Sequence, residues 1–482
     1  MNSHRDMRGH CESDPKYGAA LGIARRLREA GHAAYFAGGC VRDLLLGMEP
    51  KDYDVATSAT PDAIVALFPK TYTVGAHFGV VLVCETVSET AAEVEVATEV
   101  ATFRNDGAYS DGRRPDAVRF SSEPEDDVRR RDFTINGMLL GPEVYEATGD
   151  AAAATLDFVH GRDDLAAGIV RAIGEPKLRF MEDKLRMLRA VRFAARLHFQ
   201  IEPATVAAIH CHAGEILQVS QERIRDELTR ILTEGGARRG FELLYDLGLL
   251  ARVLPEAVRM RGVAQPPEFH PEGDVWTHTM LLLEKLPAGC SPTLAWGALL
   301  HDIGKPATYQ PPNPAIPGDR IRFNGHVEVG VRIAEVVLER LRFSNEDTAQ
   351  IVALVKNHMR FGDILQMRES TRRRFLRLPR FDEHLELHRL DAGSAHGDLT
   401  LYDFARQQYE AEPAETMRPA PLLTGDDLIA AGYKPSPQFK AMLTLAEDAQ
   451  LEGAATTRAE AMAIVQQRFP PIAASQDRQA QE

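Results

Sequence analysis

Apolar residues in the first third of the chain come in short runs, and their spacing alternates between strand and helix periods. Thr60-Pro61 predicts the start of a helix, because a hydroxyl cap precedes a proline at the first helical position. Four runs are typical of strands: Ala33–Ala37, Asp52–Ala56, Val80–Val83 and Glu93–Phe103. We therefore expect residues 1–160 to form an α+β unit, a small mixed sheet with helices.

Beyond about residue 165 the pattern becomes nearly all helical. Three local features divide this part: a proline-rich loop over 311–317, a linker over 410–421, and Thr457–Glu460, whose capping-box form opens a last helix. We expect an all-α remainder. The expected domains are 1–160, 161–262, 263–400 and a small helical segment at 415–470.

Composition restricts the class of protein. Of 482 residues, 44% are hydrophobic and 26% charged, which is ordinary globular composition. An apolar run of about 18 residues, the length that spans a membrane, is absent, and no apolar signal core follows the polar residues Met1–Asp14. The five cysteines are widely spaced without a CxxC pair, which argues against a disulfide framework and a thiolate zinc site. We expect a cytoplasmic protein with no membrane contact.

The formal net charge of −14 disfavours a nucleic-acid coat protein. It does not exclude RNA, because binding follows local basic surface and not the global sum. Local basic runs occur at Arg129–Arg131, from Arg179 to Arg196, and at Arg372–Arg374 with Arg377 and Arg380. These runs are candidate RNA contacts.

Candidate chemistry begins at Gly38-Gly39, between a predicted strand and a predicted helix that carries Arg42. Glycines there let backbone N–H groups approach a phosphate, although the pair alone is more typical of a tight strand–helix turn. Asp52 and Asp54 lie two positions apart on the next predicted strand and point to one side. Two such carboxylates suit Mg²⁺, which can activate an attacking hydroxyl and steady a leaving pyrophosphate.

Three further segments add candidate groups. Glu95 and Glu99 share one face of a later strand, where either could be a third metal carboxylate or plain surface charge. Adjacent arginines in the run Arg130–Asn136 suit triphosphate oxygens.

Asp183 and Arg186 are neighbours on one predicted helix over 182–193. A carboxylate that accepts from an amino group beside an arginine that donates to a ring nitrogen suits cytosine and adenine, and leaves both groups unpaired against uracil or guanine. The alternative is a surface ion pair worth roughly a few tenths of a kcal/mol.

These segments, in the same order, resemble the class II tRNA nucleotidyltransferase and poly(A) polymerase family. The resemblance covers roughly residues 18–260 and rests on GGCVRD, DYD, the segment from Thr102 to Pro115, RRDFTIN and EDKLRMLRAVRFA. It implies a polymerase β-like head, a helical neck and body for nucleobase selection and RNA binding, and template-independent addition of CCA to tRNA 3′ ends from CTP and ATP. It implies metal ligands at Asp52 and Asp54. Matching nucleotide-binding positions are Gly39, Arg42, Arg131, Asp183, Arg186, Arg189 and Arg192, to which we add Gly38 and Asn136.

Details within the resemblance refine it. DGRRP at 111–115 is similar to a loop of CCA- and A-adding members that CC-adding members tend to lack. The loop therefore favours full CCA addition or A addition. Lys184 stands where the family often has proline, and Gly137 stands where it usually has alanine; neither departure removes a ligand.

A second constellation is built on His301-Asp302-Ile303-Gly304-Lys305, directly after an apolar helix. Imidazole and carboxylate ligands suit Mn²⁺, Fe, Ni²⁺, Zn²⁺ or Mg²⁺, and a bridging Asp302 could hold two ions that activate water. The pattern resembles the HD superfamily of phosphohydrolases over roughly 270–395, which implies a phosphate contact for Lys305. The implied ligand set is complete: His278, His301, Asp302, His326, His358 and Asp391. The alternative is an RNA-binding scaffold with idle ligands. We interpret His384, His388 and His396 as surface residues.

The expected protein is therefore a nucleotidyltransferase with Mg²⁺ at its head, a divalent metal at its HD site, and tRNA, CTP and ATP as partners. The rivals are a poly(A) polymerase, an A-adding or CC-adding enzyme, and, from another class, an HD phosphohydrolase whose head only binds RNA. The sequence indicates no oligomeric state.

Overall fold

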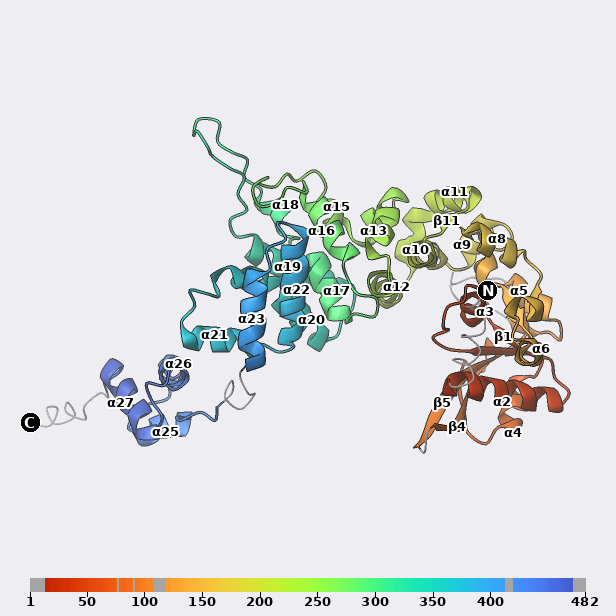
Figure 1. Ribbon diagram of the computed structural model, residues 1–482, viewed down its shortest axis with the longest axis horizontal. Helices are drawn as coiled ribbons and strands as arrows, with labels where there is room; N and C mark the ends of the chain where they lie inside the picture. Colours follow the sequence, from red (N-terminus) through yellow and green to blue (C-terminus); the bar gives the residue numbers. More distant parts are fainter. Residues whose placement is uncertain (1–13, 76–77, 90–91, 108–117, 412–418, 471–482) are drawn as a thin grey trace, which may run out of the picture. The chain divides into compact units, whose positions relative to one another are not determined.

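The computed structural model describes residues 14–75, 78–89, 92–107, 118–411 and 419–470 (Figure 1). The chain divides into two compact units. The first holds residues 1–259 with short segments at 286–290 and 340–343, and the second holds 260–285, 291–339 and 344–482. The DGRRP segment, residues 1–13 and the tail from 471 lie outside the described residues.

A mixed sheet forms the centre of the first unit. All its strands are antiparallel to their neighbours except β2 and β5, which run parallel. Among the described residues the sheet has seven strands, in the order β3 (Thr71–Gly75), β4 (Val80–Glu89), β5 (Ala92–Thr102), β2 (Asp54–Thr57), β1 (Ala34–Ala37), β8 (Met138–Leu140) and β9 (Thr155–Asp157). The predicted α+β head is confirmed.

Helix α2 (Pro15–Glu29) packs against the strands of this sheet. Asp14 caps the helix by accepting the backbone N–H of Lys16 at 2.9 Å, and proline occupies the first turn. Ile23 and Leu27 are one turn apart and are fully buried, so the helix turns one apolar face to the sheet. Helix α4 (Pro61–Leu67) begins behind Thr60, whose hydroxyl accepts from Ala63 as the sequence predicts.

Helices follow the sheet, apart from a short parallel pair within the described residues, β10 (Ile169–Val170) and β11 (Gln200–Ile201). Helix α10 (Arg186–Leu197) packs against α12 (Gln221–Thr233) and α13 (Ala237–Asp246). The predicted core residues Leu185, Leu188 and Ala195 are buried there. Helix α10 also contacts the β10–β11 pair, so it lies in the interior of this helical part.

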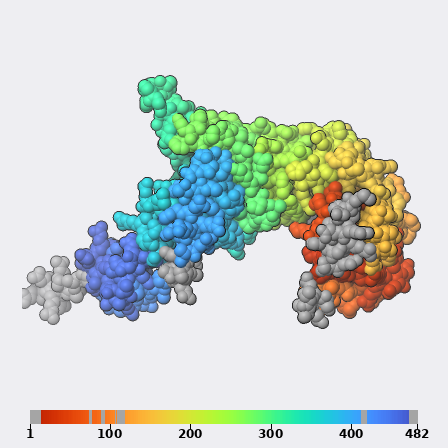
Figure 2. All heavy atoms as spheres, in the orientation of Figure 1, coloured from red at the N-terminus to blue at the C-terminus, as the bar shows by residue number. Residues whose placement is uncertain are grey.

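The second unit is helical. Its principal helices are α16 (Val275–Glu284), α17 (Pro292–Leu300), α19 (His326–Arg340), α20 (Asn345–Asn357), α21 (Glu369–Leu376), α22 (Phe381–Ser394) and α23 (Thr400–Ala411). The predicted proline-rich loop projects from the surface of this unit (Figure 1 and Figure 2) and is closed at its base by paired backbone hydrogen bonds between Gln310 and Arg322. None of the described helices combines the length and the apolar character that crossing a bilayer requires.

A small helical segment closes the described chain, with α25 (Gly425–Ala430), α26 (Gln438–Leu451) and α27 (Arg458–Arg468) around its own apolar cluster. The predicted capping box of Thr457 and Glu460 is present at α27. The basic run on α21 faces this segment: Arg374 Nε donates to Glu447 Oε2 at 2.9 Å, and Arg377 pairs with the same carboxylate. These arginines join two elements of the protein, so their charge is partly neutralised within the fold.

Gly137, one of the two departures from the pattern of the resembled family, has a packing reason. A Cβ built there would lie 2.8 Å from Ile173 Cδ1 and 2.9 Å from Val159 Cγ2. We expect Gly137→Ala to lower the free energy of unfolding by about 1–3 kcal/mol, measured as a midpoint shift in urea. Gly22→Ala is the control, because nothing lies within 4 Å of its Cβ position, and it should be neutral or stabilising by up to about 1 kcal/mol. Equal midpoints for the two variants would contradict the packing argument.

Candidate functional sites

The glycine turn positions Arg42 at the first site. Gly38 has a φ of 77°, and α3 (Gly39–Leu45) begins directly after it. From α3, Arg42 Nη1 donates to Asn136 Oδ1 at 2.7 Å and its Nε donates to Asp43 Oδ1 at 2.8 Å. The Arg42 side chain is buried, and the loss of solvation lowers its pKa. Two predicted residues that are far apart in sequence therefore meet.

Carboxylates converge on this site from two parallel strands. Asp54 opens β2, whereas Asp52 precedes the strand; the predicted strand start at residue 52 is wrong, and the two carboxylates do not owe their common direction to strand alternation. Val55 pairs with Val100 in the register of β2 with β5, which brings Glu99 beside Asp54. Burial, then Glu99 and Asp52, raise the pKa of Asp54 to about 7. Three acidic groups held together in this way suit a bound cation.

The structure distinguishes Glu95 from Glu99, which the sequence leaves as equal candidates for a third metal carboxylate. Glu99 lines the cavity with Asp52 and Asp54. Glu95, four residues earlier on the same strand, instead pairs with Lys70 at the exposed surface. Of the two, only Glu99 has the position of a third metal carboxylate.

Arg131 lies opposite these carboxylates and is held by a buried acid. Its Nη2 donates to Asp127 Oδ2 at 2.8 Å, and Arg130 Nε donates to the other oxygen at 3.0 Å. Burial opposes ionisation of Asp127, but the two arginines hold its pKa below the usual value. The predicted pair of arginines is thus fixed in place by a single carboxylate.

The Asp183–Arg186 pair is not on one helix as predicted. Helix α9 (Pro176–Glu182) ends before Asp183, whose backbone is extended, and α10 begins at Arg186. Between the two helices Asp183 Oδ1 accepts the N–H of Leu185 at 3.1 Å, a local turn that competes with a continuous helix. Both side chains still line the cavity.

Neighbouring groups brace both members of this pair. Arg223 Nη2, from α12, donates to Asp183 Oδ2 at 2.7 Å. Arg186 Nη1 donates to Glu182 Oε2 at 2.6 Å, and its Nη2 donates to the carbonyl of Arg130 at 3.1 Å. The bracing orients the carboxylate and the guanidinium from separate elements, which favours a rigid recognition surface.

The two remaining predicted arginines are paired with acids. Arg189 Nε donates to Asp132 Oδ2 at 2.7 Å. Arg192 is buried, and it donates to Glu227 Oε2 and Glu234 Oε2, both at 2.9 Å. These arginines keep positive charge along α10 while the acids fix their orientation.

All predicted head residues line one cavity of about 650 Å³, a volume typical of small-molecule sites. Sequence reasoning gave no role to several other residues of the cavity. Asp43 and Asp132 lie within the GGCVRD and RRDFTIN motifs but were not singled out. The others lie outside the recognised motifs: Lys51, Arg196, Arg223, Arg230 and Glu234.

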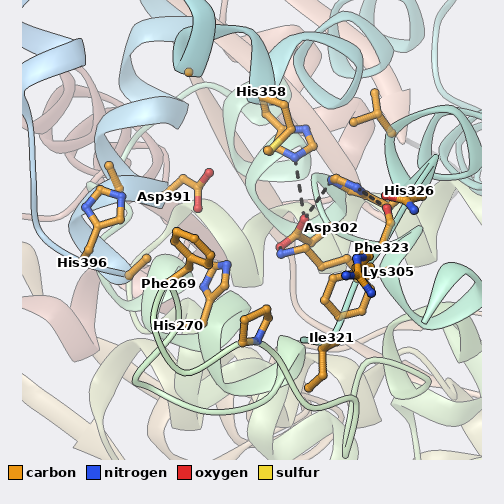
Figure 3. A pocket seen from close by; sticks show the side chains of 18 of the residues that line it. Phe269, His270, Asp302, Lys305, Ile321, Phe323, His326, His358, Asp391 and His396 are labelled. Atoms are coloured by element: carbon orange, nitrogen blue, oxygen red, sulfur yellow. Dashed lines mark hydrogen bonds and ion pairs between the residues drawn. The ribbon is translucent and has the colours of Figure 1, made fainter. Parts of the chain in front are cut away.

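The predicted HD ligands converge in the second unit (Figure 3). His301 Nε2 lies 3.3 Å from Asp302 Oδ2, while His326 Nε2 and His358 Nε2 lie 3.9 and 3.7 Å from Asp302 Oδ1. Asp391 Oδ1 lies 3.0 Å from His278 Nε2. Asp302 therefore stands between groups of histidine nitrogens, the position of a bridging ligand.

The histidines of this site fit a metal. The Nε2 atoms of His301, His326 and His358 are buried and have no hydrogen-bond partner in the part of the chain that the structure describes. Each ring has its Nδ1 2.8–2.9 Å from a backbone carbonyl, so that the proton belongs on Nδ1 and the lone pair on Nε2. Burial lowers the pKa of His358 to about 4, which keeps that ring neutral. Neutral rings with free lone pairs are metal donors.

Lys305 and Gly304 complete the motif. Lys305 Nζ lies 2.6 Å from Asp302 Oδ2 and donates to Gln265 Oε1 at 2.7 Å. Although burial opposes ionisation, Lys305 and the histidines hold the pKa of Asp302 well below its usual range. A Cβ on Gly304 would lie 2.1 Å from the carbonyl of His326, so glycine lets α19 approach the Asp302 turn.

The prediction that three other histidines lie on the surface is only partly right. His384 is buried, and His388 is half-buried and stacks on Phe361 with ring centroids 4.2 Å apart. Both lie on α22, whose several faces are covered by neighbouring helices. His396 is exposed. His388 and His396 line a cavity of about 850 Å³ that also holds Asp302 and Asp391.

Residues 34–171 match the family described as the poly(A) polymerase head domain, residues 198–260 the family of a probable RNA- and SrmB-binding site of polymerase A, and residues 274–389 the HD domain. The CCA-adding enzyme of Geobacillus stearothermophilus is 41% identical over 237 residues, 49% of this chain and 54% of that protein. That of Lactobacillus gasseri is 39% identical over 273 residues, 56% of this chain and 64% of that protein. Residues 34–171 and 198–260 are thus similar to domains of poly(A) polymerase type, and the chain is similar over about half its length to CCA-adding enzymes.

The match to these relatives is partial in length, since the chain spans 54% and 64% of the two proteins. Solved structures extend the shared fold over the chain. A Bacillus stearothermophilus CCA-adding enzyme in complex with CTP has a TM-score of 0.66 at 24% identity and covers 94% of this chain and 98% of its own. A CCA-adding enzyme with CTP has a TM-score of 0.55 at 18% identity, covering 97% and 98%. At these identities the likeness concerns the fold.

Domains of the two kinds that the chain matches, the poly(A) polymerase head and the HD domain, generally use divalent metals. The HD residues fit such an ion by their donor set, and three residue clusters in the described chain have metal-ligand spacing. One cluster contains His270 and Glu272, which the HD pattern did not include. A signal was present in the sequence as His270-Pro271-Glu272, a few residues before His278.

Proposed function

We propose that this protein is a template-independent tRNA nucleotidyltransferase that adds C and A residues to tRNA 3′ ends from CTP and ATP, releasing pyrophosphate. One observation carries the proposal: Asp52, Asp54 and Glu99 share a cavity with Arg131 and the braced Asp183–Arg186 pair. The names of the relatives, CCA-adding enzymes, support the same activity.

In the proposed reaction, Asp52 and Asp54 with Glu99 hold Mg²⁺, and the glycine turn, Arg42, Arg131 and Asn136 take the triphosphate. When bound there, Mg²⁺ lowers the pKa of the RNA 3′-hydroxyl and neutralises charge on the pyrophosphate. The 3′-hydroxyl gives its proton to solvent as its oxygen attacks the α-phosphorus in line; a new P–O bond forms, and the bond to pyrophosphate breaks.

The base is selected by its hydrogen-bonding edge. Asp183 accepts from the amino group of cytosine or adenine, and Arg186 donates to the ring nitrogen. Arg189 and Arg192 extend the nucleotide site along α10. The helical neck, which we propose spans 161–262, contacts the acceptor arm of tRNA through its phosphates, and that affinity falls with salt.

The deciding experiment supplies a tRNA lacking its 3′ CCA with each nucleoside triphosphate singly and in pairs. We expect C addition with CTP alone, one terminal A when CTP and ATP are both present, and pyrophosphate release in step with addition. Repeated A addition from ATP alone would indicate a poly(A) polymerase. Addition that stops after CC, or that requires a tRNA ending in CC, would indicate a CC-adding or A-adding enzyme.

We also propose that the HD domain, over 263–400, is a metal-dependent phosphohydrolase. The support is that the Nε2 atoms of His301, His326 and His358 are buried beside Asp302 without a hydrogen-bond partner among the described residues. Asp302→Asn should reduce hydrolysis of bis(p-nitrophenyl) phosphate by at least about tenfold, since a bridging ligand is lost. CTP incorporation into tRNA should be unchanged in the same variant. Hydrolysis at the wild-type rate would refute the phosphohydrolase and favour an RNA-binding scaffold. Loss of CTP incorporation in this variant would indicate that the HD domain and the head act together in one activity.

Of the candidate metals, we propose Mg²⁺ at the head and Mn²⁺, Fe, Ni²⁺, Zn²⁺ or Mg²⁺ at the HD site. We also propose a cytoplasmic location, because charged nucleotides and tRNA are substrates found there.

A further inference from the structure

Glu272 is a buried carboxylate outside the predicted HD ligand set. It lies in the loop before α16, and its side chain is 7% exposed. One oxygen, Oε1, lies 2.7 Å from His278 Nδ1 and 2.8 Å from His270 Nδ1. The rings of these histidines meet edge to face with centroids 4.9 Å apart. A single acid therefore holds two imidazoles beside the metal site.

His278 differs from the other histidine ligands in how its ring is held. His301, His326 and His358 use the backbone carbonyl three residues earlier. His278 lies near the start of α16, and its Nδ1 contacts the Glu272 carboxylate where the other three contact a backbone carbonyl. Its Nε2 lies 3.0 Å from Asp391 Oδ1, on the side of the proposed metal.

We propose that Glu272 is a positioning residue for the HD metal site. It accepts the Nδ1 proton of His278 and so fixes the tautomer that presents the Nε2 lone pair to the ion beside Asp391. His270 donates to the same oxygen and steadies the carboxylate from the pocket side (Figure 3). The inference rests on the proposed metal site.

In a competing arrangement, the same residues bind one additional metal ion. Donor atoms of His270, Glu272 and His278 all lie within 4.8 Å of one another, which is compatible with an additional ion held by these three residues. In that case His278 would turn its Nδ1 lone pair to the additional ion. Positioning changes the affinity of an existing site, whereas the competing arrangement changes the number of bound ions.

The test is a calorimetric titration of Mn²⁺ into the full-length, metal-stripped protein. All variants carry Asp52→Ala and Asp54→Ala, which remove the proposed head ligands. We expect Glu272→Ala to raise the Kd for Mn²⁺ by about 10- to 100-fold with the number of ions unchanged. Glu272→Gln retains an acceptor oxygen for His278 and should keep most of the affinity. Glu268→Ala, an exposed acid four residues away, is the matched control and should bind as the parent does.

Each failure has its own signature. If the parent binds no more Mn²⁺ than a variant with Asp302→Asn, the HD metal site itself is refuted. If the parent binds and Glu272→Ala binds equally well, the site stands and the positioning role is refuted. Loss of one ion in Glu272→Ala or Glu272→Gln, with the remaining affinity intact, would overturn the proposal in favour of the additional ion. Thermal unfolding of the metal-free variants checks folding, and Glu272→Gln decides the case if the alanine variant does not fold.

Discussion

Asp54→Asn should abolish nucleotide incorporation into tRNA, with kcat reduced by about a thousandfold or more. Burial, and then the charges of Glu99 and Asp52, raise the pKa of Asp54 to about 7. A bound cation would offset the repulsion between these three carboxylates. Asparagine keeps the size of the side chain and removes the charge that holds the ion. Asp52→Ala should have the same effect, because both residues line one cavity.

The measurement is single-turnover incorporation of CTP, with tRNA binding followed separately by filter retention. Binding should survive, since the proposed phosphate contacts lie on the neck. Glu95→Gln is the matched control: it lies on the same strand as Glu99 but pairs with Lys70, and it should incorporate CTP at the parent rate. Full activity in Asp54→Asn would remove the metal from the proposed mechanism.

Asp183→Ala should relax the choice of base. The ratio of kcat/KM for CTP over UTP is expected to fall by about 100-fold, because the penalty for an unpaired carboxylate against uracil is lost. In the parent protein, Arg223 and the N–H of Leu185 hold the Asp183 carboxylate in one orientation. Incorporation of CTP itself should decline less than the selectivity does, since the metal ligands are untouched.

Competition between labelled CTP and UTP on one tRNA measures this ratio directly. Glu175→Ala is the control, because Glu175 is an exposed acid at the start of α9, away from the cavity lining. Unchanged rejection of UTP and GTP by Asp183→Ala would exclude the Asp183–Arg186 pair as the base reader.

Some local predictions failed where a tertiary contact overrode a local pattern. The segment over 182–193 has helical spacing, yet Asp183 lies between two helices, where its carboxylate accepts from Arg223 of α12. His384 is polar by type and was expected at the surface, but α22 is covered on several sides. In both cases the residue's environment comes from helices distant in sequence, which periodicity does not report.

Other residues lie outside the recognised motifs. Arg223 contacts Asp183 from α12, which carries no such motif, and Glu272 precedes the HD pattern, although His270-Pro271-Glu272 offered a signal near His278. Glu95 and Glu99 are equivalent in strand alternation, and only the pairing of β2 with β5 brings one of them beside Asp54.

The sequence by itself determined the chemistry: a glycine turn, paired aspartates, arginines and a complete histidine–aspartate set are local types and spacings, and they sufficed to indicate the α+β head and the helical remainder. The tertiary structure decided which groups meet. Strand register selected Glu99, helix packing brought Arg223 to Asp183, and a loop placed Glu272 against His278. The physical reason is that hydrogen bonds and ion pairs depend on distance in space, and the chain fixes that distance only when its sheets and helices have packed.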